Sequence, residues 1–211
     1  MNGAVPLIRV VDDDTSFLTA LARMLRASGF VVKTFASAGE FLAQPELEVP
    51  GCVLVDLQMP GLSGLDLQEA LAQVGHRLPV VFLSGHGDIS TTVQAMRRGA
   101  EDFLTKRAPK EELLDAVKRA LARDARERAE RLRLEALRAR FTPLTPRERE
   151  VLAHVLTGQL NKQIADDLRI DERSVKRHRT NLMTKLQVQS VAELTHLVQD
   201  AGLWIGGRLA L

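Results

Sequence analysis

The sequence predicts an α/β domain with a doubly wound, parallel five-stranded sheet, joined by a long helix to a small all-α domain. Three observations predict this fold. Five short apolar segments alternate with amphipathic, helix-like stretches over the first 105 residues. A charged stretch without Gly or Pro then covers residues 111–140, and several short helix-like segments follow Thr145. Alternating strands and helices are typical of a parallel sheet with helices on both faces.

The five apolar segments have the length expected of buried strands. They cover residues 7–11, 31–35, 52–55, 79–83 and 102–104. In doubly wound sheets, ligands bind beyond the carboxyl ends of the strands. We therefore expect the functional residues to follow these segments directly.

Carboxylates follow two of the predicted strands. Asp12, Asp13 and Asp14 come after the first segment, and Asp56 comes after the third. Carboxylates at one sheet edge would repel each other unless a cation lay among them, and ligand sets made only of oxygen favour a hard ion such as Mg²⁺. Asp14 is better explained as the N-cap of the next helix, and a capping role is equally compatible with Asp12 or Asp13 taken singly.

The composition is that of a globular protein, with 45% hydrophobic and 27% charged residues. No apolar run approaches the roughly 18 residues that span a bilayer, and the N-terminus lacks the pattern of a signal peptide. We therefore expect a cytoplasmic protein with no membrane partner. The net charge is −3 over residues 1–120, +3 over 121–141 and +2 over 142–211. This asymmetry suits a cation-binding module joined to one that meets a polyanion.

Four motifs in the first half make the interpretation more specific. They are VVDDD at residues 10–14, LVDLQMPGLSG at 54–64, LSGHGD at 83–88 and GAEDFLTK at 99–106. In order and spacing, these motifs resemble the receiver domain of two-component response regulators over about residues 5–120. The resemblance implies that the doubly wound sheet has the flavodoxin-like form.

The resemblance also implies a phosphorylation site. Asp56 would be the phosphoacceptor, and a partner sensor histidine kinase would be the phosphodonor. Asp12, Asp13 and Asp56 would hold Mg²⁺, with the backbone carbonyl of Gln58 as a further ligand. A carboxylate can attack a phosphoryl group only if the transferring oxygens are neutralised, which is the task of the metal and of the nearby cation Lys106.

Two further residues have switch roles by the same resemblance. Ser84 would hydrogen-bond the new phosphoryl oxygens and draw its loop inward, and Phe103 would be the aromatic residue that repacks in response. The aspartyl phosphate would thereby bias a two-state element. An ordinary turn role for Ser84 and a core role for Phe103 are the structural alternatives.

The residues after Lys106 depart from the receiver pattern. Receivers usually follow this lysine directly with a proline in a cis peptide, whereas here proline arrives only at Pro109. A cis bond before another residue costs about 3–4 kcal/mol, so we expect the turn to be trans or reshaped. A changed turn puts the placement of Lys106 in question.

Residues 111–140 are predicted to form one long helix whose first part closes the first domain. Its second part carries scattered apolar residues among charges of both signs, compatible equally with a short coiled coil and with a solvated spacer. Two prolines at 143 and 146 cannot continue the helix. We therefore place the receiver at 1–122, a helical linker at 123–141 and the second domain at 142–211.

The second half reads as four short helices. Thr145, Pro146 and Glu148 form a helix start with a capping box, and the first helix should run to near Gly158. Further helices are expected at about 161–168, 172–186 and 190–199. A basic-faced helix that follows a shorter one across a tight turn is the arrangement of a helix-turn-helix recognition helix. On the charge pattern alone, a solvated helix face is the more common explanation.

Three motifs favour the DNA-binding interpretation. They are LTPREREVL at 144–152, NKQIA at 161–165 and SVKRHRTNLMTKL at 174–186. They resemble the LuxR-type DNA-binding domain, from residue 142 to about 202, so the whole chain resembles the NarL/FixJ family. The resemblance places Lys176 and Arg177 nearest to the bases. The residues expected to contact mostly phosphates are Lys162, Ser174, Arg179 and Lys185.

The resulting hypothesis is a transcription regulator, not an enzyme, that is activated by phosphorylation and binds double-stranded promoter DNA as a homodimer. The sequence leaves two alternatives. One is a DNA-binding regulator whose receiver is degenerate and independent of phosphorylation. The other is a Mg²⁺-dependent phosphohydrolase, which leaves the second half unexplained. The tail from residue 204 onward fits no pattern.

Overall fold

The computed structural model describes residues 5–44, 46–73, 78–85 and 89–210. The chain divides into two compact units, Met1–Arg128 and Ala129–Leu211, and each is described by itself. Within the described ranges, no helix combines the length and the apolar character that crossing a membrane requires.

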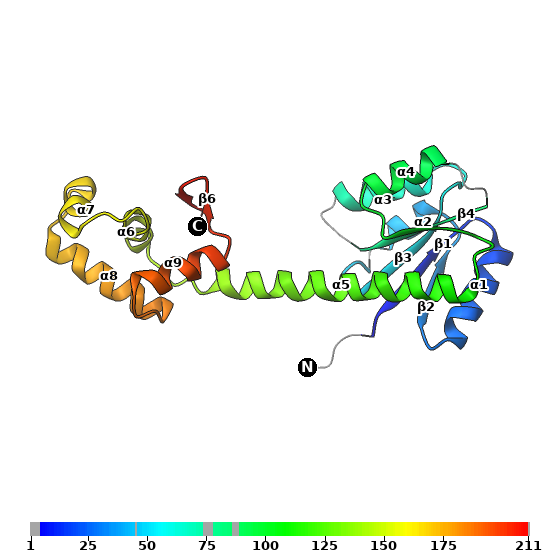
Figure 1. Cartoon of the computed structure of the whole chain (residues 1–211), viewed down its shortest axis with the longest axis horizontal. Helices are drawn as coiled ribbons and strands as arrows, with labels where there is room; N and C mark the ends of the chain where they lie inside the picture. Colours follow the sequence, from blue (N-terminus) through cyan, green and yellow to red (C-terminus); the bar gives the residue numbers. More distant parts are fainter. Residues whose placement is uncertain (1–4, 45, 74–77, 86–88, 211) are drawn as a thin grey trace. The chain divides into compact units, whose positions relative to one another are not determined.

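The first unit is the predicted doubly wound α/β domain (Figure 1). Its parallel sheet has the order β2-β1-β3-β4-β5, which confirms the fold class. The strands are β1 (Leu7–Val11), β2 (Val31–Phe35), β3 (Gly51–Asp56), β4 (Val80–Ser84) and β5 (Asp102–Thr105). The helices are α1 (Thr15–Ala27), α2 (Ala38–Ala43), α3 (Gly64–Gln73), α4 (Ile89–Arg97) and α5 (Lys110–Ala139).

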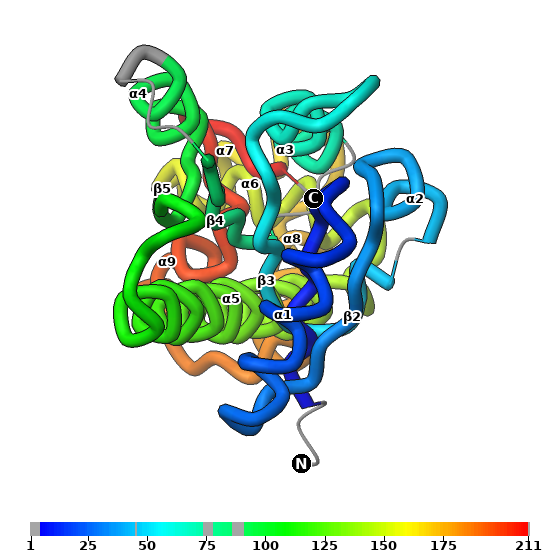
Figure 2. The backbone as a smooth tube through the Cα atoms, turned by 90° about the vertical axis from the view of Figure 1, so that its right-hand side faces the viewer, coloured from blue at the N-terminus to red at the C-terminus, as the bar shows by residue number. Residues whose placement is uncertain are grey.

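Helices cover both faces of this sheet, as Figure 2 shows. Successive residues of a strand point to opposite faces. In β3, Leu54 packs with residues of α1 and α5, whereas Val53 and Val55 pack with residues of α2, α3 and α4. Burial on both faces explains why the strands read as continuous apolar runs. The order of strands reverses between the neighbours β1 and β3, so the switch point lies at their carboxyl ends.

Helix α5 holds the first unit together through a buried polar network that the sequence did not predict. Asp124 is buried, accepts a 2.8 Å hydrogen bond from the Gly51 N–H and pairs with Arg128 Nε at 2.9 Å. Arg128 also donates to the carbonyls of Leu47 and Glu48 at 3.0 and 2.9 Å. The helix therefore keeps contact with this unit as far as Arg128. The domain limits 1–122, 123–141 and 142–211 stay a prediction.

Arg9 completes this network from inside β1. Its side chain is fully buried and donates to backbone carbonyls of Leu7 at 3.2 Å, Val49 at 3.0 Å and Glu46. Burial disfavours its charged form and lowers the pKa of the Arg9 guanidinium. Gly51 must be glycine here because its φ is +150° and an added Cβ would lie 1.9 Å from the Leu7 carbonyl oxygen.

The second unit contains four short helices around one apolar core. They are α6 (Pro146–Leu156), α7 (Asn161–Leu168), α8 (Glu172–Leu186) and α9 (Val191–Asp200). The capping box is present: the Glu148 N–H donates to Thr145 Oγ1 and the Thr145 N–H donates to Glu148 Oε2. Buried Val175, Leu182 and Leu186 place one face of α8 in the core.

The tail, for which the sequence predicted no secondary structure, forms a small hairpin. Strands β6 (Trp204–Ile205) and β7 (Arg208–Leu209) pair antiparallel around Gly206 and Gly207. Both glycines have positive φ, 56° and 79°, which is the backbone that two-residue hairpin turns require. Trp204 packs against the core of this unit, so its fluorescence reports on this unit alone, because the chain has one Trp and no Tyr.

Candidate functional site

The carboxylates predicted to form a cation site lie together at the switch point of the sheet. β1 pairs with β3 so that Val11 lies opposite Val55. Asp12 and Asp56 directly follow these two paired residues in the sequence. One oxygen from each of Asp12, Asp13 and Asp56 lies within 4.8 Å of the others. Asp12 is 0% exposed and Asp56 6% exposed, whereas Asp13 faces solvent. The cluster is therefore buried on two sides and open at Asp13.

Lys106 brings a positive charge into this cluster from the end of β5. Its Nζ lies 2.7 Å from Asp12 Oδ2 and 3.0 Å from Asp56 Oδ2. Its backbone N–H donates to the Ser84 carbonyl at 2.8 Å, which fixes the end of β5 against β4. No cis peptide bond occurs among the residues that the structure describes, so the turn from Lys106 to Pro109 is trans, as expected.

The electrostatics of the cluster follow from burial and from Lys106. Burial raises the pKa of the Asp12 carboxyl, although hydrogen bonds from Lys106 and the Asp14 N–H act in the opposite direction. Burial works against the charged form of Lys106, but hydrogen bonds to Asp12 and Asp56 outweigh it and raise the Lys106 pKa. The cluster contains three carboxylates and one ammonium, which contacts two of them, so negative charge remains to be balanced.

The residues of the cluster fit a hard divalent cation. Asp12 Oδ2 is buried, and its 2.7 Å contact with the Lys106 ammonium is an ion pair without hydrogen-bond geometry. Carboxylate oxygens are the ligands that Mg²⁺ prefers, and its remaining positions usually keep water, for which the exposed side of Asp13 leaves room. Gln58 directs its N–H toward Asp56 Oδ1 at 3.4 Å, and its carbonyl as a ligand stays a prediction.

The two predicted switch residues lie on the neighbouring strands. Ser84 is the last residue of β4, is buried, and lies opposite Thr105 of β5. Phe103 in β5 is half-buried and stacks on Phe82 with ring centroids 6.3 Å apart. Both switch roles stay predictions. Residues 86–88 of the LSGHGD motif lie outside the described residues.

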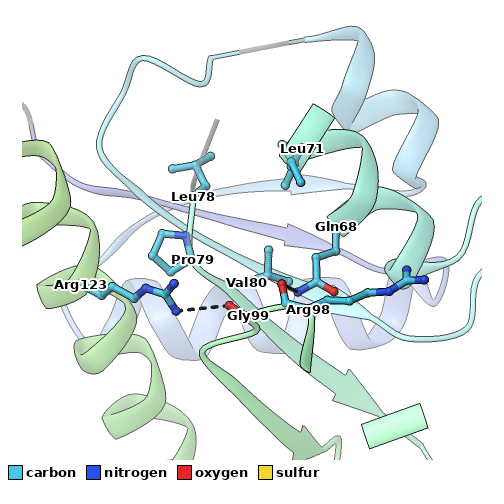
Figure 3. Close-up of a pocket in the computed structure, with 9 residues that line it drawn as sticks. Gln68, Leu71, Leu78, Pro79, Val80, Arg98, Gly99 and Arg123 are labelled. Atoms are coloured by element: carbon cyan, nitrogen blue, oxygen red, sulfur yellow. Dashed lines mark hydrogen bonds between the residues drawn. The ribbon is translucent and has the colours of Figure 1, made fainter. Parts of the chain in front are cut away.

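A cavity of about 320 Å³ lies at the opposite edge of the sheet (Figure 3). It is lined by residues at the start of β4, including Pro79 and Val80, whereas the carboxylates lie at the strands' carboxyl ends. The arginines on its wall are engaged, Arg98 with Glu69 at 3.3 Å and Arg123 with Glu101 at 3.2 Å. The described residues of its wall therefore do not include a set of groups suited to phosphoryl chemistry.

Helix α8 presents a basic surface in the second unit. Asp171 caps its start by accepting from the Ser174 N–H at 2.8 Å, and the Ser174 hydroxyl also donates to Asp171. Lys176 and Arg177 are exposed, and Lys176 makes an exposed pair with Glu172 of the kind that contributes little. Both side chains are therefore accessible to a polyanion.

Two of the predicted phosphate-contacting residues also make contacts inside the unit. Arg179 donates to Asn161 Oδ1 at 2.7 Å and so joins α8 to the start of α7. Lys185 Nζ lies 2.7 Å from Glu148 Oε2 and 3.1 Å from the Pro143 carbonyl. Glu148 is only 2% exposed, so Lys185 neutralises a buried charge. If Arg179 and Lys185 contact DNA as predicted, each must do so while it keeps its hydrogen bonds within the unit.

Sequence reasoning assigned Glu148 to the capping box and missed its pairing with Lys185. A signal was present. Glu148 precedes Val151, Leu152 and Val155 at helical spacing, and these three residues form the buried face of α6. A charged residue on such a face requires a partner of opposite charge. The pair fixes the C-terminal end of α8 against the N-terminus of α6.

A carboxylate cluster at the switch point of a doubly wound sheet, joined to a helix-turn-helix with a basic face, is the arrangement of a regulatory DNA-binding protein. Comparison with known proteins agrees. Residues 8–118 match the response regulator receiver domain, and residues 142–198 match the bacterial regulatory proteins of the luxR family. The chain belongs to the transcriptional response regulators that join a receiver domain to a LuxR-type DNA-binding domain.

The chain is similar to these regulators over nearly its whole length. Response regulator protein TmoT of Ectopseudomonas mendocina is 42% identical over 94% of this chain and 90% of its own length. Transcriptional regulatory protein FixJ of Azorhizobium caulinodans is 37% identical over 93% of both chains. The solved structure of response regulator StyR has a TM-score of 0.79 and 45% identity, over 93% of this chain and 99% of that one.

The Glu148–Lys185 pair predicts acid sensitivity in the second unit. Burial works against ionisation of Glu148, but hydrogen bonds from Lys185 and Thr145 outweigh it and lower the Glu148 pKa. An unfolded glutamate has a pKa of about 4.3. The pair therefore stabilises the folded unit above that pH, and the contribution is lost as the pH falls through the folded pKa.

We expect Glu148→Gln to lower the free energy of unfolding at pH 7 by about 1–3 kcal/mol, because Lys185 loses its charged partner. Below about pH 5, acidification should also lower the free energy of unfolding less in the variant than in the wild type. Urea denaturation of the full chain, followed by Trp204 fluorescence, measures both. Glu150→Gln, which breaks an exposed pair with Arg147, is the control. Wild-type stability and acid dependence in Glu148→Gln would contradict the assignment.

Proposed function

We propose that the receiver accepts a phosphoryl group on Asp56 from a sensor histidine kinase, and that phosphorylation activates binding of double-stranded promoter DNA. The observation that carries this proposal is the convergence of Asp12, Asp13 and Asp56 around Lys106, in a chain that ends in a LuxR-type domain. Because the kinase and the DNA would be met inside the cell, we place the protein in the cytoplasm with no membrane partner.

The residues of the cluster have separate tasks in this transfer. An oxygen of the Asp56 carboxylate bonds to phosphorus while the bond from phosphorus to the donor's imidazole nitrogen breaks, and imidazole leaves. Asp12, Asp13, Asp56 and the Gln58 carbonyl would hold Mg²⁺, which neutralises charge on the transferring oxygens when bound. Lys106 already contacts Asp56 and would move its ammonium to a phosphoryl oxygen.

Ser84 and Phe103 would transmit the modification. The Ser84 hydroxyl, at the end of β4, would donate to a phosphoryl oxygen and draw the following segment inward. When the segment after Ser84 moves inward, the Phe103 ring would repack in response. The phosphoryl group adds charge and acceptors and biases a two-state element, so its effect is regulatory. We propose that the chain is not a turnover enzyme, since its family consists of DNA-binding regulators.

We propose that α8 enters the major groove. Lys176 and Arg177 would contact base edges, because they are exposed on α8. The residues proposed to bind phosphates are Lys162, Ser174, Arg179 and Lys185. A phosphorylated homodimer would present two recognition helices to two half-sites of the promoter.

Asp56→Asn should abolish phosphorylation, because the amide cannot act as the nucleophile. Incubation of the full chain with labelled acetyl phosphate and Mg²⁺ measures the incorporated phosphate. Asp115→Asn, on the exposed side of α5, is the control and should incorporate phosphate like the wild type. Incorporation by Asp56→Asn at the wild-type level would refute the site. Equal DNA affinity of the wild type with and without phosphodonor would favour the degenerate-receiver alternative.

Lys176→Ala and Arg177→Ala should each weaken binding to a duplex selected from random DNA by about 1–3 kcal/mol and relax sequence preference. Lys162→Ala should weaken binding to all sequences. It should also reduce the slope of log affinity against log salt concentration by about one. Fluorescence anisotropy at several salt concentrations separates the two effects. Arg208→Ala, an exposed cation on the hairpin, should change neither. Unchanged binding in the Lys176 and Arg177 variants would contradict the assignment of α8.

A further inference from the structure

Phe17 lies directly beside the ammonium group of Lys106. The Lys106 Nζ is 4.8 Å from the centroid of the Phe17 ring, within the distance at which an aromatic face attracts a cation. The same Nζ contacts Asp12 and Asp56, so the ammonium has two carboxylates and one aromatic ring around it. The ring has no task in the phosphoryl transfer proposed above.

The position of Phe17 is fixed by the start of α1. Asp14 caps this helix, and its Oδ1 accepts from the Phe17 N–H at 3.0 Å. The Phe17 side chain is partly buried and packs against the core cluster that α1 and α5 share. The ring is therefore held by a capped helix and by core contacts, independently of Lys106.

The Lys106 side chain, in contrast, is held through its ammonium group, which contacts Asp12, Asp56 and the Phe17 ring. Its backbone is anchored by the bond to the Ser84 carbonyl, and the next residue with a fixed φ is Pro109. A lysine side chain is long and flexible, and its ammonium acts as a point charge that can turn toward several acceptors. Asp12 competes for it, since the Nζ lies closer to Asp12 Oδ2 than to Asp56 Oδ2.

We infer that Phe17 is a positioning residue for Lys106, which keeps the ammonium beside Asp56 and lets it turn from Asp12 to an incoming phosphoryl oxygen. An aromatic face attracts a cation without requiring a particular hydrogen-bond direction. The ring can therefore hold the ammonium while its N–H groups change partners. This inference rests on the proposed phosphorylation of Asp56.

The test compares Phe17→Leu, which keeps an apolar side chain but removes the ring, with Phe17→Tyr, which keeps the aromatic face. Phe30→Leu is the matched control, because Phe30 is also partly buried against the same core cluster. The phosphorylation rate with acetyl phosphate and saturating Mg²⁺ is measured on the full chain. We expect Phe17→Leu to be about 5- to 30-fold slower, and Phe17→Tyr and Phe30→Leu to remain near the wild type.

A second readout needs neither metal nor phosphodonor. In the wild type and in Phe17→Tyr, the ε-methylene protons of Lys106 should show an upfield ring-current shift by NMR, assigned with Lys106→Arg. Phe17→Leu should lose that shift. The inference is overturned if the shift persists in Phe17→Leu or if that variant is phosphorylated at the wild-type rate. It is also overturned if Phe30→Leu is slowed equally, or if Phe17→Tyr is not phosphorylated at a rate near that of the wild type. If the wild type takes up no phosphate, the proposed function fails, and the NMR shift alone decides whether Phe17 positions Lys106.

Discussion

The contact of Lys106 with Asp12 and Asp56 is the interaction on which the proposed function of the first unit depends. The parallel pairing of β1 with β3 brings two carboxylates to adjacent strand ends, where burial raises the pKa of Asp12. One ammonium at 2.7 and 3.0 Å offsets part of that effect. The remaining negative charge, with Asp13 open to solvent, suits a cation that can be bound and released.

A similar arrangement, with a different consequence, organises the second unit. Glu148 is buried at the start of α6 and is neutralised by Lys185 from the end of α8. Here one positive charge matches one negative charge, and the pair orients α8 against α6. The basic residues Lys176 and Arg177 lie on the exposed side of that same helix. One unit thus holds excess negative charge at the carboxyl ends of its strands, and the other holds positive charge on the surface of a helix.

The sequence predicted the parts of this structure that follow from local pattern and from the rule for parallel sheets. Apolar runs identified the strands, and the rule that ligands bind at strand ends directed attention to Asp12 and Asp56. Capping residues located the start of α6 at Pro146. These features depend on neighbours in the chain or on a regularity that all doubly wound sheets share.

Contacts between distant positions could not be predicted in this way. Arg9 is buried because carbonyls up to 40 residues away accept its hydrogen bonds, and the strand sequence alone carries no sign of them. Lys185 finds Glu148 at a separation of 37 residues, so its basic character suggested only DNA. The ring of Phe17 meets Lys106 only after α1 and β5 are placed on the sheet. Each of these depends on tertiary packing.

The most direct test of the central claim is calorimetric titration of the full chain with Mg²⁺ in the absence of phosphodonor. If acidic side chains from neighbouring strands form one cation site, the wild type binds a single ion, and Asp13→Asn and Asp56→Asn each weaken binding by about tenfold or more. Asp115→Asn leaves it unchanged. An absence of saturable binding in the wild type, or wild-type affinity in Asp13→Asn and Asp56→Asn, would contradict the account.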